Sequence, residues 1–113
     1  MKEFLLLFRM DITNPEAQPT DQQMEIYMQQ WMEWIDDIAD NDQLGEGGHH
    51  LSKQGRVIKS NNETIETPYI AENNSVAGYI LVLAKNLDEA TTIAKKCPIL
   101  NGPNTSVEIR ETA

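Results

Sequence analysis

The chain has 113 residues, which suits one domain (residues 1–113) and leaves no room for a second hydrophobic core. Apolar residues make up 40% of it and charged residues 24%, as in an ordinary globular domain. The 18 acidic and 9 basic residues give a net charge of −9, which argues against binding to nucleic acid. A single cysteine, Cys97, excludes an internal disulfide framework and a cysteine-based zinc site.

No segment of the sequence is apolar for long enough to cross a bilayer. The first residues also lack the layout of a signal peptide, because a lone Lys2 is followed by a short apolar run and then by Arg9. We therefore expect a cytoplasmic protein without a membrane partner.

The first half of the chain predicts a strand, a loop and a helix. Residues 3–9 (EFLLLFR) predict a strand that is apolar on both faces. Residues 10–19 are expected to form a loop, and Thr20 with Gln23 has the spacing of a helix capping box. The helix is expected to end near residues 40–42, with Gly45 in its C-terminal turn. Its predicted buried stripe consists of Met24, Met28, Trp31, Ile35 and Ile38.

The second half predicts an extended segment, four further strands and a second helix. Residues 48–51 are expected to be extended, and residues 56–59 and 64–67 to pair as a hairpin. Residues 76–84 (VAGYILVLA) predict a strand that is apolar on both faces. Asn86 and Glu89 repeat the capping pattern at the start of the second helix. Apolar and charged residues alternate in residues 105–111, which predicts a last strand with one solvent-exposed face.

This order, β-α-β-(β)-β-α-β, predicts an α+β fold of the ferredoxin-like, split β-α-β type. Right-handed crossovers then place both helices on one face of an antiparallel sheet. The other face would be too apolar to remain exposed in a monomer, because two of its strands are apolar on both sides. We therefore expect a homodimer that packs sheet to sheet.

The stretch ETPYIAENNSVAGYILVLAKNLDEATTIAKKCP, residues 66–98, resembles the YCII-related family in the branch named for its Asp-Gly-Pro-Phe motif. The motif position reads Glu66-Thr67-Pro68-Tyr69, and the LDEA helix and closing Cys97-Pro98 also fit the family pattern. The resemblance implies a dimeric α/β barrel. Thr67 replaces the motif glycine, and acids common downstream in the family fall on Ala71 and Asn74, so part of any chemistry of those acids is missing here.

Three residues are candidates for a catalytic role: His49, His50 and Glu66. The histidines are adjacent, so a strand would direct them to opposite faces, where one could line a cavity and act as a base. The alternative is a histidine pair on a polar rim. Glu66 could serve as a carboxylate base in the family motif, or it could cap a backbone amide in a structural corner.

Three more residues are candidates for binding a ligand: Tyr69, Trp34 and Glu46. The Tyr69 phenol could hold a small polar ligand together with Glu66, or pack at the barrel end. Trp34 lies beside the main helical stripe, which favours a cavity wall or a dimer contact, whereas Trp31 is expected in the core. Glu46 stands between glycines that would let a ligand approach, although a solvated turn is the favoured interpretation.

Acidic residues are concentrated in one part of the chain. Between Met10 and Ser52 there are ten Asp or Glu residues and no Lys or Arg. This pattern fits a surface for a cation or a basic partner, or a solvated helix face, which we prefer. No metal-ligand spacing and no nucleotide-binding motif is present, so we expect no metal and no cofactor. Cys97 follows a helix C-terminus, where the helix dipole disfavours a thiolate nucleophile.

Three classes of function remain open from the sequence. The resemblance favours a cofactor-free enzyme that acts on a small polar or aromatic molecule, in a cleft between the first helix and the sheet. The others are a homodimer that binds a small ligand without turnover, and a homodimer that serves only in protein interactions.

Overall fold

The computed structural model describes residues 1–14 and 19–113. Part of the loop expected at residues 10–19 therefore lies outside the described residues. The elements along the described chain are β1 (Lys2–Met10), α1 (Asp21–Asp40), β2 (Leu44–His50), β3 (Val57–Ile58), β4 (Thr64–Ile65), β5 (Ser75–Ala84), α2 (Leu87–Ala94), the short 3-10 helix η2 (Pro98–Asn101) and β6 (Ser106–Glu111). Every expected helix and strand is present, with shifted ends.

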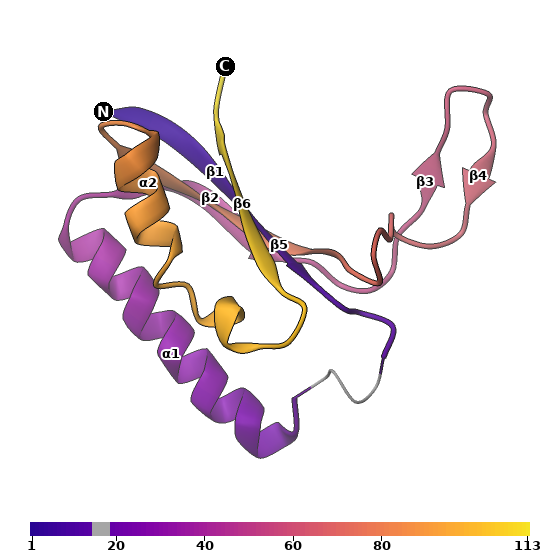
Figure 1. Ribbon diagram of the computed structural model, residues 1–113, viewed down its shortest axis with the longest axis horizontal. Helices are drawn as coiled ribbons and strands as arrows, with labels where there is room; N and C mark the ends of the chain where they lie inside the picture. Colours follow the sequence, from indigo (N-terminus) through magenta and orange to yellow (C-terminus); the bar gives the residue numbers. More distant parts are fainter. Residues whose placement is uncertain (15–18) are drawn as a thin grey trace.

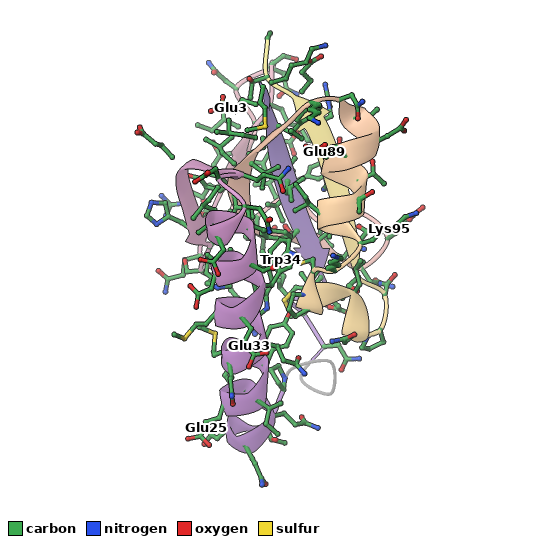
Figure 2. The ribbon with its side chains drawn as sticks, turned by 90° about the vertical axis from the view of Figure 1, so that its left-hand side faces the viewer. Glu3, Glu25, Glu33, Trp34, Glu89 and Lys95 are labelled. Atoms are coloured by element: carbon green, nitrogen blue, oxygen red, sulfur yellow. The ribbon has the colours of Figure 1, made fainter. Side chains whose placement is uncertain are left out.

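Four strands form an antiparallel sheet in the order β2-β5-β1-β6. The two central strands pair Leu6 with Ile80, and β1 pairs the same Leu6 with Ile109 of β6. Both helices cover one face of this sheet, as Figures 1 and 2 show. The predicted ferredoxin-like α+β class is therefore confirmed. Strands β3 and β4 pair separately and form an arm that stands off the end of the sheet (Figure 1).

The predicted capping residues begin both helices. The Thr20 hydroxyl accepts from the Gln23 amide at 3.2 Å, and the Gln23 side chain accepts from the Thr20 amide at 2.9 Å, which completes a capping box. The Asn86 side chain accepts from the Glu89 amide at 2.9 Å. The Glu89 carboxylate accepts instead from the side chain of Gln43 at 2.8 Å, so it ties α2 to the segment before β2.

Helix α1 ends at Asp40, within the range predicted, but Gly45 does not belong to its C-terminal turn. The left-handed residue after the helix is Asp42, with φ 56°, and Gly45 lies inside β2. A Cβ atom on Gly45 would lie 2.9 Å from the Leu81 Cβ, so this glycine permits the close approach of β2 to β5. Strand β2 consequently begins at Leu44, earlier than the extended segment expected from residue 48.

The hydrophobic core lies between the helices and the sheet. It is built from alternate strand residues, such as Phe4, Leu6 and Val82, and from one face of α1. The expectation that Met24 and Met28 belong to this face is wrong, because both are substantially exposed. The buried residues of the helix, Trp31, Trp34 and Ile38, all lie in its C-terminal half, whereas Met24 and Met28 lie in its N-terminal half. The core residues are Phe4, Leu6, Phe8, Trp31, Trp34, Ile38, Ile80, Val82, Ala84, Ala90, Ile93, Ala94, Cys97 and Ile99.

The opposite face of the sheet carries the other set of alternating residues. Leu5 and Leu7 of β1 pair with Leu81 and Tyr79 of β5, and all four are partly exposed. Figure 1 shows the sheet nearly edge-on, with both helices on one side and the arm rising on the other. The Cα radius of gyration, 15.2 Å, exceeds the roughly 13 Å of a compact domain of this length. We call the sheet surface that carries Leu5, Leu7, Tyr79 and Leu81 the open face.

Candidate functional site

The two histidines at the end of β2 point to opposite sides of the sheet. His49 pairs with Tyr79 on the open face, and their ring centroids are 6.1 Å apart. The His50 ring lies on the helix side, where it meets the edge of Trp31 from α1 at a centroid distance of 5.5 Å. The alternation expected for adjacent strand residues therefore separates the histidines, and only His50 adjoins the aromatic core.

Trp31 is the centre of an aromatic cluster between α1 and the sheet. Its ring centroid lies 4.9 Å from that of Phe8, 5.9 Å from Tyr27 and 5.3 Å from Trp34, all in edge-to-face arrangements. Such pairs stabilise by about 0.5–1.5 kcal/mol each beyond the burial of their surface. The cluster therefore fixes the position of Trp31 against which His50 rests.

The two tryptophans of α1 differ in how their indole N–H groups are satisfied. Trp31 is 5% exposed and Trp34 is 6% exposed. The Trp34 Nε1 donates to the Ile93 carbonyl of α2 at 3.1 Å. The Trp31 Nε1 is also buried, but within residues 1–14 and 19–113 it meets no acceptor in hydrogen-bonding geometry. Because buried donors in proteins are nearly always satisfied, the Trp31 N–H stands out as a donor without a protein acceptor among the described residues.

Tyr27 stands one helical turn before Trp31 and is half-buried beside it. Burial raises the pKa of its phenol, and the Trp31 N–H, which approaches the phenol oxygen without reaching hydrogen-bonding geometry, lowers it in part. The phenol therefore stays protonated at neutral pH and can donate a hydrogen bond. Together, Tyr27, Trp31 and His50 place a phenol hydroxyl, an indole N–H and an imidazole on one aromatic cluster, and we call these three residues the aromatic triplet.

The motif residues Glu66 and Tyr69 lie elsewhere. Glu66 directly follows β4 in the arm, where its carboxylate pairs with Arg56 at 2.9 Å and both side chains are largely exposed. Strands β3 and β4 of the arm stand off the sheet (Figure 1). The Tyr69 side chain is 68% exposed, and its carbonyl accepts from the Ser75 hydroxyl. These two residues thus do not join His50 in a common site within this chain.

The remaining ligand candidates are also dispersed. Trp34 is enclosed in the core, although it borders a shallow depression of about 510 Å³ between α1 and η2. Glu46 is exposed on β2, where the register with β5 shifts between Leu44 and Gly48. Gly47, beside Glu46, has φ 103°, a conformation that favours glycine. The carboxylate of Glu46 therefore projects from a bulge at the sheet edge.

A second shallow depression, of about 680 Å³, runs along the outer side of α1. Neither histidine lines it or the depression beside η2. Across the described ranges, no group of three or more His, Cys, Asp or Glu side chains is arranged to hold a metal ion. None of the helices in these ranges is long and apolar enough to cross a membrane.

Cys97 lies in the core, between α2 and η2. Burial raises the pKa of its thiol to about 12, and a hydrogen bond from the Ile99 backbone lowers it only in part. The thiol therefore remains protonated at neutral pH, which agrees with the expectation that Cys97 is not a nucleophile.

Sequence reasoning placed Trp31 in the core but did not detect its unsatisfied N–H, and it did not single out Tyr27. The helical spacing of residues 27 and 31 brings their side chains to one face. No sequence signal, however, shows which of two neighbouring indoles will find an acceptor. That difference depends on where α2 presents the Ile93 carbonyl.

The chain was also compared with models of known protein families and with curated proteins, and neither comparison gave a match.

Proposed function

We propose that the protein is a homodimeric, cofactor-free catalyst that binds a small polar or aromatic molecule against the aromatic triplet. The observation that carries this proposal is the buried Trp31 N–H without a protein acceptor, on an indole whose ring contacts the His50 imidazole. Leaving a buried donor unsatisfied costs about 1–3 kcal/mol, so a ligand oxygen that accepts from Trp31 would bind with a corresponding gain. The rings of Phe8 and Tyr27, which pack against Trp31, would contact a flat or apolar ligand body.

His50 has the role of general base in this proposal. A neutral imidazole can take a proton from a carbon next to a carbonyl group. The carbonyl oxygen, which gains negative charge as that proton leaves, would accept the hydrogen bond from Trp31 Nε1. Return of the proton from His50 to another atom of the same molecule completes an isomerisation, in which no electrons are exchanged with a cofactor.

Three observations support the dimer. The open face presents Leu5, Leu7, Tyr79 and Leu81 side by side on the two central strands. The arm rises on the same side of the sheet, and its Ile58 is 72% exposed (Figure 1). A second copy packed on the open face would cover these side chains and give the arm a surface to rest on. The resemblance of residues 66–98 to the YCII-related family points to the same dimeric barrel.

The dimer can be tested by sedimentation equilibrium at micromolar concentration. The expected mass is twice that of the 12.8 kDa chain. Leu81→Lys would place a charge in the centre of the open face and is expected to give monomers. Leu87→Lys makes the same change at an exposed position of α2 and should leave the dimer intact. A monomeric native protein would refute the dimer.

Catalysis can be tested with small carbonyl compounds and carboxylic acids. Compounds that raise the melting temperature of the native protein, but not that of Trp31→Phe, are selected first. Each is then incubated with the protein in heavy water, and deuterium incorporation next to its carbonyl is followed by NMR. His50→Gln should retain binding and lose the exchange, whereas the matched His49→Gln should retain both.

Two results would count against this function. If no compound stabilises the native protein more than Trp31→Phe, the aromatic triplet is not a ligand site. If compounds bind but neither the native protein nor His49→Gln exchanges deuterium, the protein binds small molecules without turnover, which was the alternative left open by the sequence.

A further inference from the structure

Three methionines form an exposed stripe on α1. Met24, Met28 and Met32 follow one another at four-residue spacing, so their side chains lie along one side of the helix. They are 41%, 41% and 64% exposed. The core-facing arc of the helix is occupied by Trp31, Trp34 and Ile38, so the stripe is not needed to hold α1 on the sheet. We call Met24, Met28 and Met32 the methionine stripe.

Carboxylates border the methionine stripe along its whole length. Asp21, Glu25, Glu33 and Asp36 line the same shallow depression as the three methionines. Figure 2 shows Glu25 and Glu33 on the outer side of α1, away from the sheet. None of these four acids takes part in an ion pair with another described residue. The surface therefore combines an adaptable apolar strip with uncompensated negative charge.

This combination restricts what can cover the stripe. A second copy of the chain would bring two acidic surfaces together, and like charges in a closing interface cost free energy. A purely apolar partner would desolvate the carboxylates without pairing them. A helix with one apolar and one basic side satisfies both parts of the surface, since its apolar side chains contact methionine and its Lys or Arg residues pair with the acids.

We propose that the outer side of α1 is a docking surface for a basic amphipathic helix of a partner protein. Methionine suits this role because its unbranched, flexible side chain adapts to differently shaped apolar partners. The net charge of −9 would attract such a helix from a distance and speed its association at low salt. This surface lies on the opposite side of the sheet from the open face, so docking does not depend on the proposed dimer or on the aromatic triplet.

A defined probe tests the proposal. A fluorescein-labelled peptide of about 18 residues, five helical turns, carries Leu on one side of the helix and Lys on the other. A second peptide of the same composition has the residues in an order that gives no apolar side. Binding to the native protein is followed by fluorescence anisotropy at about 0.15 M salt. The amphipathic peptide is expected to bind at least about tenfold more tightly than its scrambled control.

Variants locate the surface. Replacing all three methionines (Met24→Gln, Met28→Gln and Met32→Gln) should weaken binding by about tenfold or more, while glutamine preserves the helix. Two double variants remove the same charge from α1. Glu25→Gln with Glu33→Gln, beside the stripe, should weaken binding about fivefold or more. Asp37→Asn with Asp40→Asn, outside the stripe, should change it by less than about twofold. Circular dichroism checks that every variant keeps its helices.

Three outcomes would overturn the proposal. Equal weakening by both double variants would mean that binding of the peptide depends on the overall negative charge of the protein and not on the acids beside the methionine stripe. Unchanged binding by the methionine variant would mean that the apolar strip is not contacted. An oligomer larger than the dimer that the methionine variant dissociates would show that another copy of the chain covers the stripe.

Discussion

His50 at the end of β2 meets the edge of Trp31 on α1, with ring centroids 5.5 Å apart and ring planes at 74°. The contact joins the edge strand of the sheet to the long helix at the one described indole whose N–H is buried and unsatisfied. An imidazole beside an indole donor provides a base and a hydrogen-bond donor on one aromatic surface. The contact between His50 and Trp31 depends on the alternation of side chains along β2, which directs His50 to the helix side and the neighbouring His49 to the open face.

The two tryptophans provide a matched pair of substitutions. Trp31→Phe and Trp34→Phe each replace a buried indole by a smaller ring and remove one N–H. In Trp34→Phe the bond to the Ile93 carbonyl is lost, whereas in Trp31→Phe an unsatisfied donor is lost. We expect Trp34→Phe to lower the free energy of unfolding by about 1–3 kcal/mol more than Trp31→Phe does. Urea denaturation of both variants measures this difference.

Equal losses in the two variants would mean that the Trp31 N–H is satisfied in solution, for example by an ordered water. The comparison is insensitive to the general cost of replacing indole by phenyl, because both sites are buried to nearly the same extent. The comparison also shows whether Trp31→Phe is stable enough to serve as the control in the ligand screen.

Much of the fold could be predicted because its determinants are local. Hydrophobic periodicity marked the strands and helices, and the capping side chains of Thr20 and Asn86 set the beginnings of both helices. The end of α1 at Asp40 was predicted, but the role of Gly45 was not, because this glycine permits close packing of two strands and does not terminate the helix. Local sequence does not distinguish these two uses of glycine.

The buried face of α1 was predicted less well than the fold. Spacing alone assigned Met24 and Met28 to the buried face, together with Trp31. Spacing identifies one face of a helix but not which turns of that face are covered, and here the buried residues Trp31, Trp34 and Ile38 all lie in the C-terminal half of α1. The sequence also does not show how its candidate site residues are arranged in space. Glu66 follows β4 in the arm, whereas His50 ends β2 in the main sheet.

Gly78 offers a test of the close packing between β2 and β5. A Cβ atom at this position would lie 2.8 Å from the carbonyl oxygen of His49, closer than real contacts allow. Gly78→Ala must therefore displace the end of β2, and we expect it to lower the free energy of unfolding by about 1–3 kcal/mol. It should also weaken ligand binding at His50, the residue next to the displaced carbonyl.

Gly102→Ala is the matched control for Gly78→Ala. Its Cβ would lie 3.2 Å from a methyl group of Thr105, and its φ of −87° suits any residue. We expect a change within about 0.5 kcal/mol. If Gly78→Ala is as mild as this control in thermal and urea unfolding, β2 does not pack on β5 as closely as the structure has it.

Cys97 predicts how stability depends on alkaline pH. Burial raises the pKa of its thiol from 9.0 to about 12, so the folded chain holds this proton when the unfolded chain has lost it. A raised pKa of an acid stabilises the fold fully below about pH 9, and this contribution is lost progressively as the pH rises from about 9 toward about 12. The slope from this one group is at most about 1.4 kcal/mol per pH unit.

The contribution of Cys97 can be isolated with Cys97→Ala. Both proteins are unfolded by urea at about pH 8, 9 and 10, where the native protein should lose stability more steeply than the variant. The half-buried Tyr27 acts in the same direction but is present in both, so the difference in slope reports the thiol. Parallel slopes, or rapid labelling of the native thiol by iodoacetamide at pH near 8, would show that Cys97 reaches solvent and that the contact between α2 and η2 opens readily.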